Sequence, residues 1–449
     1  MLRITLFKIS LLAISFITFL QIPGNLFGQT VPDQQNDFIT LEEAIRVGLE
    51  RNFSIIIAKN SAEIASLNRN PGAAGFFPEL DLTAGLSGGQ EDLVLTENGI
   101  ESPSERTTNS VANLDAALNW TVFDGFKMFS TYNKLKEFEN LGFINARIQI
   151  ENTVGDIISS YFNIIRIQKR MAVLENTVEI SQERHRIADT KLQIGSGSEY
   201  EFLLAQTDLN SDRAAVIRES VLLNDAKVRL MTLLNLDPLT DFEVSTEIEL
   251  GNPIEFSDVM NAMSSENKVL NAAQIQTRIA SLERQEVLRG RMPTIDLNAG
   301  YQINHRETEN SIRRLQEIDG IRYGVTVRVP IFEGFNLNRK LQAARIYEKN
   351  AELSLNEITS QLNSLAVAEF QNYVSSRNVV ELERENLELA NQTIEIALER
   401  FYQGTISSLE LRESQRTLID TETRLITAQY EAKLSETELF KLMGKLSVD

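Results

Sequence analysis

Four segments of the chain alternate apolar and polar side chains, as an extended strand with two different faces does. In the first, LDLTAGL at 80–86, the leucines and the alanine fall on one side, and Asp81 and Thr83 fall on the other. The same alternation runs through 112–122, 295–304 and 322–329. Segments of about ten alternating residues are typical of membrane-barrel strands, and also of an ordinary half-buried sheet. The pattern therefore predicts four strands with one apolar face, and it leaves both environments open for that face.

Four strands are too few to close a membrane barrel, because the smallest barrels have about eight. An open sheet edge in lipid would also leave backbone groups without hydrogen bonds. If these strands cross a membrane, several copies of the chain must therefore share one barrel.

Helical periodicity without proline follows the second and the fourth strand, from about 127 to 194 and from about 338 to 402. Val154, Ile158 and Tyr161 step by four and three, as in a coiled-coil seam. At 1.5 Å per residue, each segment spans roughly 100 Å. Such rods favour a wall of helices packed side by side over the alternative, a compact four-helix bundle. Shorter helices are expected near 40–68, 199–235, 256–289 and 408–443.

An internal duplication organises these elements. TVFDGF at 121–126 matches PIFEGF at 330–335 with a shift of 209 residues, and FFPELDLTAGL at 76–86 matches RMPTIDLNAGY at 291–301 with a shift of 215. The difference of six residues falls in a polar segment after Leu86, where a length change is tolerated. Each copy is expected to contain a helix, two strands and a long helical hairpin. The predicted divisions are a first repeat at 29–236, a linker at 237–254 and a second repeat at 255–449.

The N-terminus predicts export. Arg3 and Lys8 precede an uncharged, mostly apolar run, and a small residue follows at Gly28. This layout is that of a secretory signal peptide, and we expect it to occupy 1–28. The apolar run is too short for a membrane-spanning helix.

Composition narrows the function classes. A formal net charge of −19 argues against a nucleic-acid partner. The chain has no cysteine and only two histidines, and it shows no nucleotide-binding loop or Ser/His/Asp set. We therefore expect no enzyme activity, no cofactor and no metal site.

Two glycines interrupt the long helices at equivalent places, Gly195 and Gly404, which are 209 residues apart. Glycine permits the left-handed backbone that ends a helix. A serine three residues later, Ser198 or Ser407, is a good N-cap for a returning helix. The sequence thus predicts two helical hairpins that turn at these glycines.

With these features the chain resembles the TolC-like outer-membrane efflux proteins, over essentially all of its mature length. The duplication, TVFDGF, VPIFEGF and the two hairpin breaks carry the resemblance. The family's breaks read glycine, a small or hydroxyl residue three positions later, and an acid six positions later. Gly195, Ser198 and Glu201 fit this pattern, and the second break fits it as well, with Gly404, Ser407 and Glu410. Departures are the use of Glu where Asp is commoner, and Thr121 where the second copy has Pro330.

The resemblance implies a mainly α-helical chain with a membrane β-barrel portion, completed as a homotrimer in outer-membrane lipid. It implies a passive exit duct of a tripartite efflux or type I secretion system, with a long periplasmic extension. The hairpin turns would dock on a periplasmic adaptor protein and an inner-membrane transporter. The rival interpretation is a structural coiled-coil protein of the cell envelope without a pore.

The resemblance also assigns Glu410 and Glu413 to the periplasmic entrance gate. The family's constricting acids lie six and nine residues after the second hairpin glycine, which are these two positions. The ordinary interpretation is a surface acid pair, in which Glu413 binds Arg416 on the same helix. The first copy has Leu204 at the second position, so one hairpin per chain would carry the pair.

Overall fold

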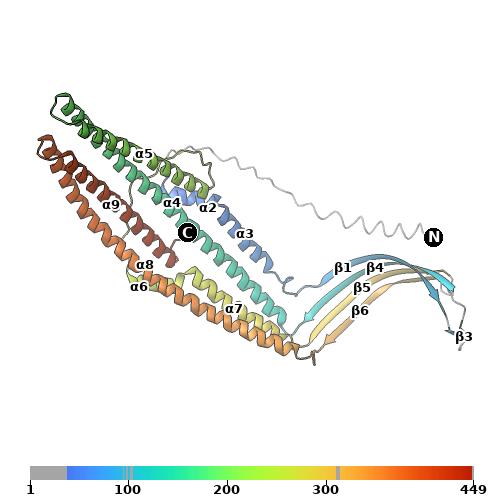
Figure 1. Ribbon diagram of the computed structural model, residues 1–449. Coiled ribbons are helices and arrows are strands. Elements are labelled where there is room, and N and C mark those ends of the chain that lie inside the picture. Colours follow the sequence, from blue (N-terminus) through green and yellow to red (C-terminus); the bar gives the residue numbers. More distant parts are fainter. Residues whose placement is uncertain (1–37, 95, 98–99, 102–104, 310–313, 447–449) are drawn as a thin grey trace. The chain divides into compact units, whose positions relative to one another are not determined.

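A computed structural model describes residues 38–94, 96–97, 100–101, 105–309 and 314–446 (Figure 1). The predicted signal peptide at 1–28 lies outside these residues. Within the described part of the chain, no helix has the length and apolar character needed to cross a membrane.

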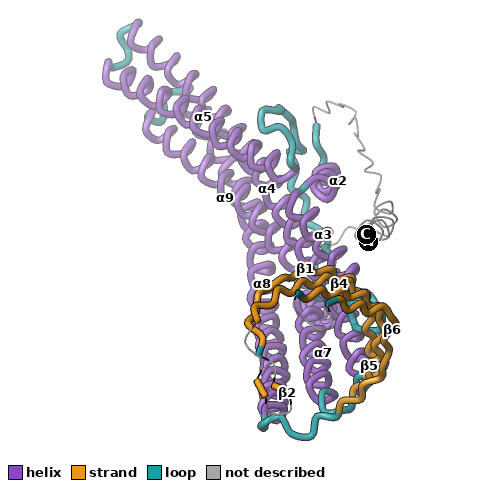
Figure 2. Tube along the Cα trace, turned by 90° about the vertical axis from the view of Figure 1, so that its right-hand side faces the viewer, coloured by secondary structure: helices purple, strands orange, loops and turns teal. Residues whose placement is uncertain are grey.

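The four predicted strands form one antiparallel sheet in the order β1-β4-β5-β6. Its strands are longer than the alternating segments: β1 (Glu79–Leu93), β4 (Glu105–Phe123), β5 (Thr294–Thr308) and β6 (Leu315–Arg328), with a short pair, β2 (Thr96–Glu97) and β3 (Ile100–Glu101), between β1 and β4. Figure 2 shows that the sheet follows a curved wall. β1 and β6 each pair on one side, so both edges of the sheet are free as far as the described residues of one chain go.

Two long helices continue from the sheet, and each turns back at a predicted glycine. They are α4 (Lys127–Gln193), which returns as α5 (Glu199–Leu234), and α8 (Asn336–Tyr402), which returns as α9 (Ser408–Leu442). α4 and α8 have 67 residues each, or about 100 Å. Both begin after a phenylalanine in the left-handed region, Phe126 or Phe335, that follows a left-handed glycine. The junction is thus built alike in both copies, although only one of them has Pro330.

The two shorter predicted helices before the sheet strands are each broken in two, which corrects the expectation of single helices. α2 (Leu41–Arg51) and α3 (Phe53–Asn68) are separated at Asn52, and α6 (Phe256–Glu266) and α7 (Lys268–Arg289) are separated at Asn267.

Asparagine chemistry explains both breaks. The Asn52 side chain accepts a hydrogen bond from Ser54 N–H (2.9 Å) and donates one to the Leu233 carbonyl (2.8 Å). Asn267 likewise accepts from Leu270 N–H and donates to the Leu442 carbonyl, each at 2.9 Å. Each asparagine therefore caps one helix and ties it to the end of its own hairpin.

The helices lie side by side in a fixed order (Figure 1). Next to the sheet the order is α3, α4, α7 and α8, which matches the strand order β1, β4, β5 and β6. Toward the hairpin turns the order is α5, α4, α9 and α8. α4 and α8 run through both halves, so each chain offers four helical rows of similar length. The arrangement is the wall predicted from the helix lengths, with α3/α5 on one flank and α8 on the other.

The segment between the two copies is fastened to both long helices. On α4, the Tyr161 hydroxyl donates to the Ile39 carbonyl (3.1 Å) and accepts from Ser245 N–H (3.3 Å). On α8, the Tyr373 hydroxyl accepts from Ile254 N–H (3.2 Å). The largest buried apolar cluster surrounds the first of these tyrosines and joins α2, α4, α5 and the segment after α5.

Candidate functional site

The first hairpin turns at Gly195, whose φ is +74°. Ser196 N–H reaches back to the Lys191 carbonyl (2.9 Å), which is the bond of a Schellman-type helix end. A Cβ at Gly195 would meet no atom within 4 Å, so the backbone angle alone demands glycine. Ser198 caps α5 by accepting from Glu201 N–H (3.2 Å).

The second hairpin repeats this construction at Gly404, with φ +72° and a bond from Thr405 N–H to the Arg400 carbonyl (2.9 Å). Ser407 caps α9, and here the cap is reciprocal. Ser407 Oγ accepts from Glu410 N–H (3.2 Å), while Glu410 Oε2 accepts from Ser407 N–H (2.8 Å). The predicted left-handed glycines and serine caps are confirmed at both turns.

Glu410 and Glu413, the predicted gate acids, lie one turn apart on α9 and are both exposed in a single chain. The bond from Ser407 N–H, with a second from its hydroxyl, lowers the pKa of the Glu410 carboxyl, which is therefore anionic at neutral pH. Among the described residues, the Glu413 carboxylate has no ion pair, so its predicted surface bond to Arg416 is not formed. One of the two acids is held by the cap, and the other is free to face a second chain or solvent.

The two hairpin ends touch each other within one chain. Lys191 Nζ lies 4.9 Å from the centre of the Phe401 ring, and Ile187 packs against a buried cluster formed by α8 and α9. The predicted turn residues of both repeats therefore gather at the same end of the helical wall.

A buried network of charges joins the two hairpins and was missed by the sequence analysis. Arg412 on α9 donates two hydrogen bonds to the Asp212 carboxylate on α5 (2.8 and 2.9 Å). Ser181 on α4 donates to the same carboxylate (2.5 Å). Arg184 on α4 pairs with Asp208, one turn away on α5. Hydrogen bonding to Asp212 raises the pKa of Arg412, whereas burial lowers the pKa of Arg184.

A signal for this network does exist in the sequence. Ala205, Leu209 and Asp212 step by four and three along α5, and Ser181 and Arg184 continue such a seam on α4. A charged residue at a seam position needs a partner on a neighbouring helix, because burying it alone is costly. The partner helix is set by the packing of α9 against α4. The sequence of one segment alone does not specify this packing.

The sheet has the two faces that alternation predicts. Leu80, Leu118 and Ala299 are aligned across three neighbouring strands, and Tyr323 completes the row. The apolar rows on β5 run from Ile295 to Ile303, which is about 26 Å along the strand. Much of this face is uncovered in one chain, with Tyr323 at 87% exposure. On β5 this height matches the apolar belt of a membrane barrel, and Asp319 opposite Ile303 marks the end of the band on β6.

Polar side chains on the opposite face form hydrogen bonds with one another. Arg322 on β6 donates to both oxygens of Asp115 (2.9 Å each), reaching across β5. Thr121 donates to Asp296 (2.6 Å). One face of the sheet therefore suits lipid and the other suits water.

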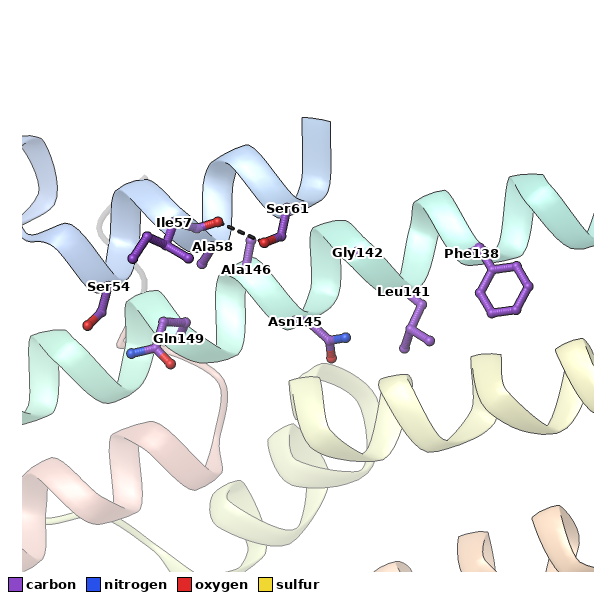
Figure 3. Close-up of a pocket in the computed structure, with 10 residues that line it drawn as sticks. All are labelled: Ser54, Ile57, Ala58, Ser61, Phe138, Leu141, Gly142, Asn145, Ala146 and Gln149. Carbon is purple, nitrogen blue, oxygen red and sulfur yellow. Dashed lines mark hydrogen bonds between the residues drawn. The ribbon is translucent and has the colours of Figure 1, made fainter. Parts of the chain in front are cut away.

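A groove of about 590 Å³ lies between α3 and α4 (Figure 3). The two helices approach closely there, and Gly142 permits this because it has no side chain: a Cβ at this position would lie 2.8 Å from Ala65 Cβ. The hydrogen bond drawn in Figure 3 joins Ser61 to the Ile57 carbonyl within α3 itself (2.8 Å). None of the ten lining residues is charged, so the groove is a packing feature rather than a site for chemistry.

Comparison with known proteins identifies the family of this chain. The model of one family, described as outer membrane efflux protein, matches residues 45–236 and 259–445. The chain belongs to this family. The outer membrane efflux protein BepC of Brucella suis is 20% identical over 351 residues, covering 77% of this chain and 74% of BepC. The outer membrane protein TolC of Vibrio cholerae is 21% identical over 387 residues, covering 83% of each chain.

The fold of this efflux protein is also that of solved channels. The crystal structure of the Campylobacter jejuni CmeC outer membrane channel superposes with a TM-score of 0.75 at 15% identity, covering 90% of this chain and 85% of CmeC. The predicted TolC-like fold is therefore confirmed. This efflux protein is an outer-membrane channel of an efflux or secretion system, with a helical tunnel that extends into the periplasm. The interpretation as a coiled-coil protein without a pore is wrong.

Proposed function

We propose that three copies of this chain close a twelve-stranded barrel in the outer membrane and form one continuous duct with their helices. The observation that carries the proposal is the sheet itself. It has a lipid-matched apolar face, a polar face and two unpaired edges, so it needs further strands before it can lie in a bilayer. Three copies supply twelve strands, above the minimum of about eight.

The duct is passive and has no catalytic activity of its own. Its selectivity comes from the side chains that line it and from the transporter that feeds it. We further propose that each chain consists of a first repeat at 29–236, a linker at 237–254 and a second repeat at 255–449. The same order of helices, strands and hairpin in both halves supports this division.

The hairpin turns are the proposed docking end for a periplasmic adaptor protein and an inner-membrane transporter. Gly195, Ser198, Glu201, Gly404 and Ser407 build this end. The construction of the turns supports the assignment, since both are closed by backbone bonds and serine caps.

Glu410 and Glu413 are the proposed gate of the periplasmic entrance. In a ring of three, these acids place six carboxylates around one opening. A ring of carboxylates favours cations and is blocked by multivalent ones. Within one chain, the bonds from Ser407 lower the pKa of the Glu410 carboxyl and so favour its charged form.

Planar-bilayer recording of the Glu410→Ala/Glu413→Ala variant tests the gate. We expect weaker cation selectivity and weaker block by trivalent cations than in the wild type. Thr417→Ala on the same helix is the matched control and should behave like the wild type. Among the described residues, the Thr417 hydroxyl bonds only to the Glu413 carbonyl, one turn away. Unchanged selectivity and block in the double variant would remove both acids from the gate.

A further inference from the structure

The two copies differ in chemistry at the junction between the sheet and the helices. The shift of 215 residues that aligns the copies before the sheet places Phe76 on Arg291. The shift of 209 residues after the sheet places Phe129 on Asn338. The structure keeps this equivalence: β1 and β5 each begin three residues after the first position of the pair, and α4 and α8 each begin two residues before the second. An aromatic pair in the first copy is therefore replaced by a charged and a polar residue in the second.

In the first copy the aromatic pair fills its own space. The rings of Phe76 and Phe129 lie edge to face with their centres 5.0 Å apart. Trp120, which lies opposite Leu297 on the apolar face of the sheet, donates from Nε1 to the Phe76 carbonyl (2.9 Å). Aromatic side chains of this kind are typical of the boundary between the apolar belt of a barrel and the aqueous phase.

In the second copy the same place is a pocket of about 290 Å³. Arg291 and Asn338 line it, and Arg291 Nη2 donates to Asn338 Oδ1 (2.6 Å). The apolar wall of the pocket consists of Ile331, Phe332 and Phe335, which are each more than 70% exposed. An arginine and a group of exposed apolar side chains thus share one pocket.

The pocket lies where the apolar face of the sheet meets the helices. Arg291 precedes Ile295, the first of the apolar rows on β5, by four residues. On the other side of the pocket, Val327 and Val329 continue the alternation of β6 toward Ile331. With the apolar face in lipid, the pocket is therefore at the head-group level of the periplasmic leaflet, where long cationic side chains reach the interface.

The position of the pocket does not depend on the free edge of the sheet. Arg291 connects α7 to β5, and both elements have neighbours on two sides within the chain. The other lining residues follow the end of β6 and begin α8. The pocket thus lies between the helix-side ends of β5 and β6.

Two opposite charges line the pocket without pairing. Arg291 and Glu333 form no ion pair with each other or with any other described residue. Glu333 stands where the first copy has Asp124, whose carboxylate accepts from Met128 N–H (2.8 Å) and so caps α4. No such bond holds the exposed Glu333 carboxylate among the described residues. A guanidinium has five N–H donors, so the bond to Asn338 leaves others free for a ligand.

We propose that this pocket binds a phospholipid whose head group carries both a phosphate and an ammonium group, as in phosphatidylethanolamine. The Arg291 guanidinium binds the phosphate, because its planar fork of N–H donors matches the phosphate oxygens. The Glu333 carboxylate binds the ammonium group, and Ile331, Phe332 and Phe335 contact the acyl chains. The inference rests on the proposed assignment of the apolar face to lipid, and it identifies a lipid that this face selects.

Native mass spectrometry of the purified oligomer tests the site. The oligomer in detergent is titrated with phosphatidylethanolamine, or with phosphatidylglycerol, which has the phosphate but no ammonium group. The wild type should bind phosphatidylethanolamine more tightly, with one such lipid for each chain. Arg291→Gln should weaken the binding of both lipids by about tenfold or more, since a charged hydrogen-bond partner is lost. Glu333→Gln should abolish the preference for phosphatidylethanolamine.

Two variants separate binding from folding. Arg339→Gln removes an equal charge from the first turn of α8 but outside the pocket, where Arg339 bonds to Asn336, so it should bind lipid like the wild type. Arg291→Phe/Asn338→Phe introduces the aromatic pair of the first copy. This double variant should assemble normally with its pocket filled and should lose the tightly bound lipid. Retention of that lipid would place the binding elsewhere and overturn the proposal.

Inorganic phosphate distinguishes a lipid site from a site for free anions. An excess of phosphate should not displace the lipid, because phosphate makes no contact with the apolar wall. Displacement by phosphate, equal binding of the two lipids by the wild type, or equal affinity in Arg291→Gln and Arg339→Gln would overturn the lipid site. The proposed duct would stand in each of these cases if the oligomer conducts ions in a bilayer. A chain that neither assembles nor conducts would refute the duct, and the lipid site with it.

Discussion

Val325 and Thr326 are neighbours on β6 that face opposite environments in the proposed barrel. Val325 is 66% exposed on the apolar face, opposite Leu297. Thr326 lies on the polar face, opposite Asp296. Val325→Arg therefore places a charge against lipid, whereas Thr326→Arg places the same charge in water beside an acid.

The depth of Val325 sets the size of the effect. The centre of the apolar rows on β5 is Ala299, and Val325 lies one row from it, about 7 Å along the strand. An arginine on the lipid side costs about 2–4 kcal/mol at the midplane and less toward the interfaces, so we expect about 2 kcal/mol per chain. This corresponds to roughly a thirtyfold shift in the insertion equilibrium.

The assay is the amount of heat-sensitive oligomer recovered from the outer-membrane fraction. Val325→Arg should strongly reduce it. Thr326→Arg should leave it close to the wild-type level, because an opposite-charge pair across strands is worth about 0.2–1 kcal/mol in its favour. Equal recovery of the two variants would refute the assignment of the apolar face to lipid.

Three further changes test the hairpin end. Gly404→Val puts a β-branched residue at φ +72°, which costs about 1–2 kcal/mol of backbone strain. The variant should still insert as an oligomer but should show impaired transport and impaired cross-linking to the adaptor. Normal transport would argue against the turn as the docking end. Arg412→Ala removes the charged partner of the buried Asp212 carboxylate and leaves it the Ser181 hydroxyl, so we expect about 3 kcal/mol less stability in thermal unfolding. Arg412→Ala/Asp212→Ala should regain part of this loss, and a lack of regain would show that the pair is not coupled. In the folded chain the pKa of Glu410 is lowered, so the charged carboxylate stabilises the first turn of α9. This stabilisation is complete above about pH 4.5, the ordinary pKa of a glutamate, and is lost as the pH falls through the lower pKa of the folded chain. Hydrogen exchange of that turn, corrected for intrinsic rates, should therefore lose protection at low pH in the wild type and lack this pH dependence in Glu410→Ala.

Features that depend on local chemistry could be predicted from the sequence. The hairpin turns at Gly195 and Gly404 follow from the backbone freedom of glycine and from serine caps three residues later. The two faces of the sheet follow from alternation, which assigns Leu118 and Asn119 to opposite sides without knowledge of the neighbouring strands.

Features that depend on distant partners could not. Asn52 and Asn267 break their helices because each side chain also binds a carbonyl about 180 residues away, at Leu233 or Leu442. The bond between Arg412 and Asp212 depends on how one hairpin packs on the other. Glu410 combines both kinds of feature: its reciprocal cap with Ser407 is local and follows the Ser-x-x-Glu pattern, whereas a role in the gate depends on neighbouring chains.

Copies of this chain are proposed to enclose a water-filled passage through the outer membrane. The most direct measurement is the ion conductance of the purified full-length chain in a planar lipid bilayer. We predict discrete conductance steps from inserted oligomers, with cation selectivity that falls when Glu410 and Glu413 are both replaced by alanine. Oligomers that insert into the bilayer, as shown by protease protection of the sheet, but conduct no ions would contradict a water-filled passage.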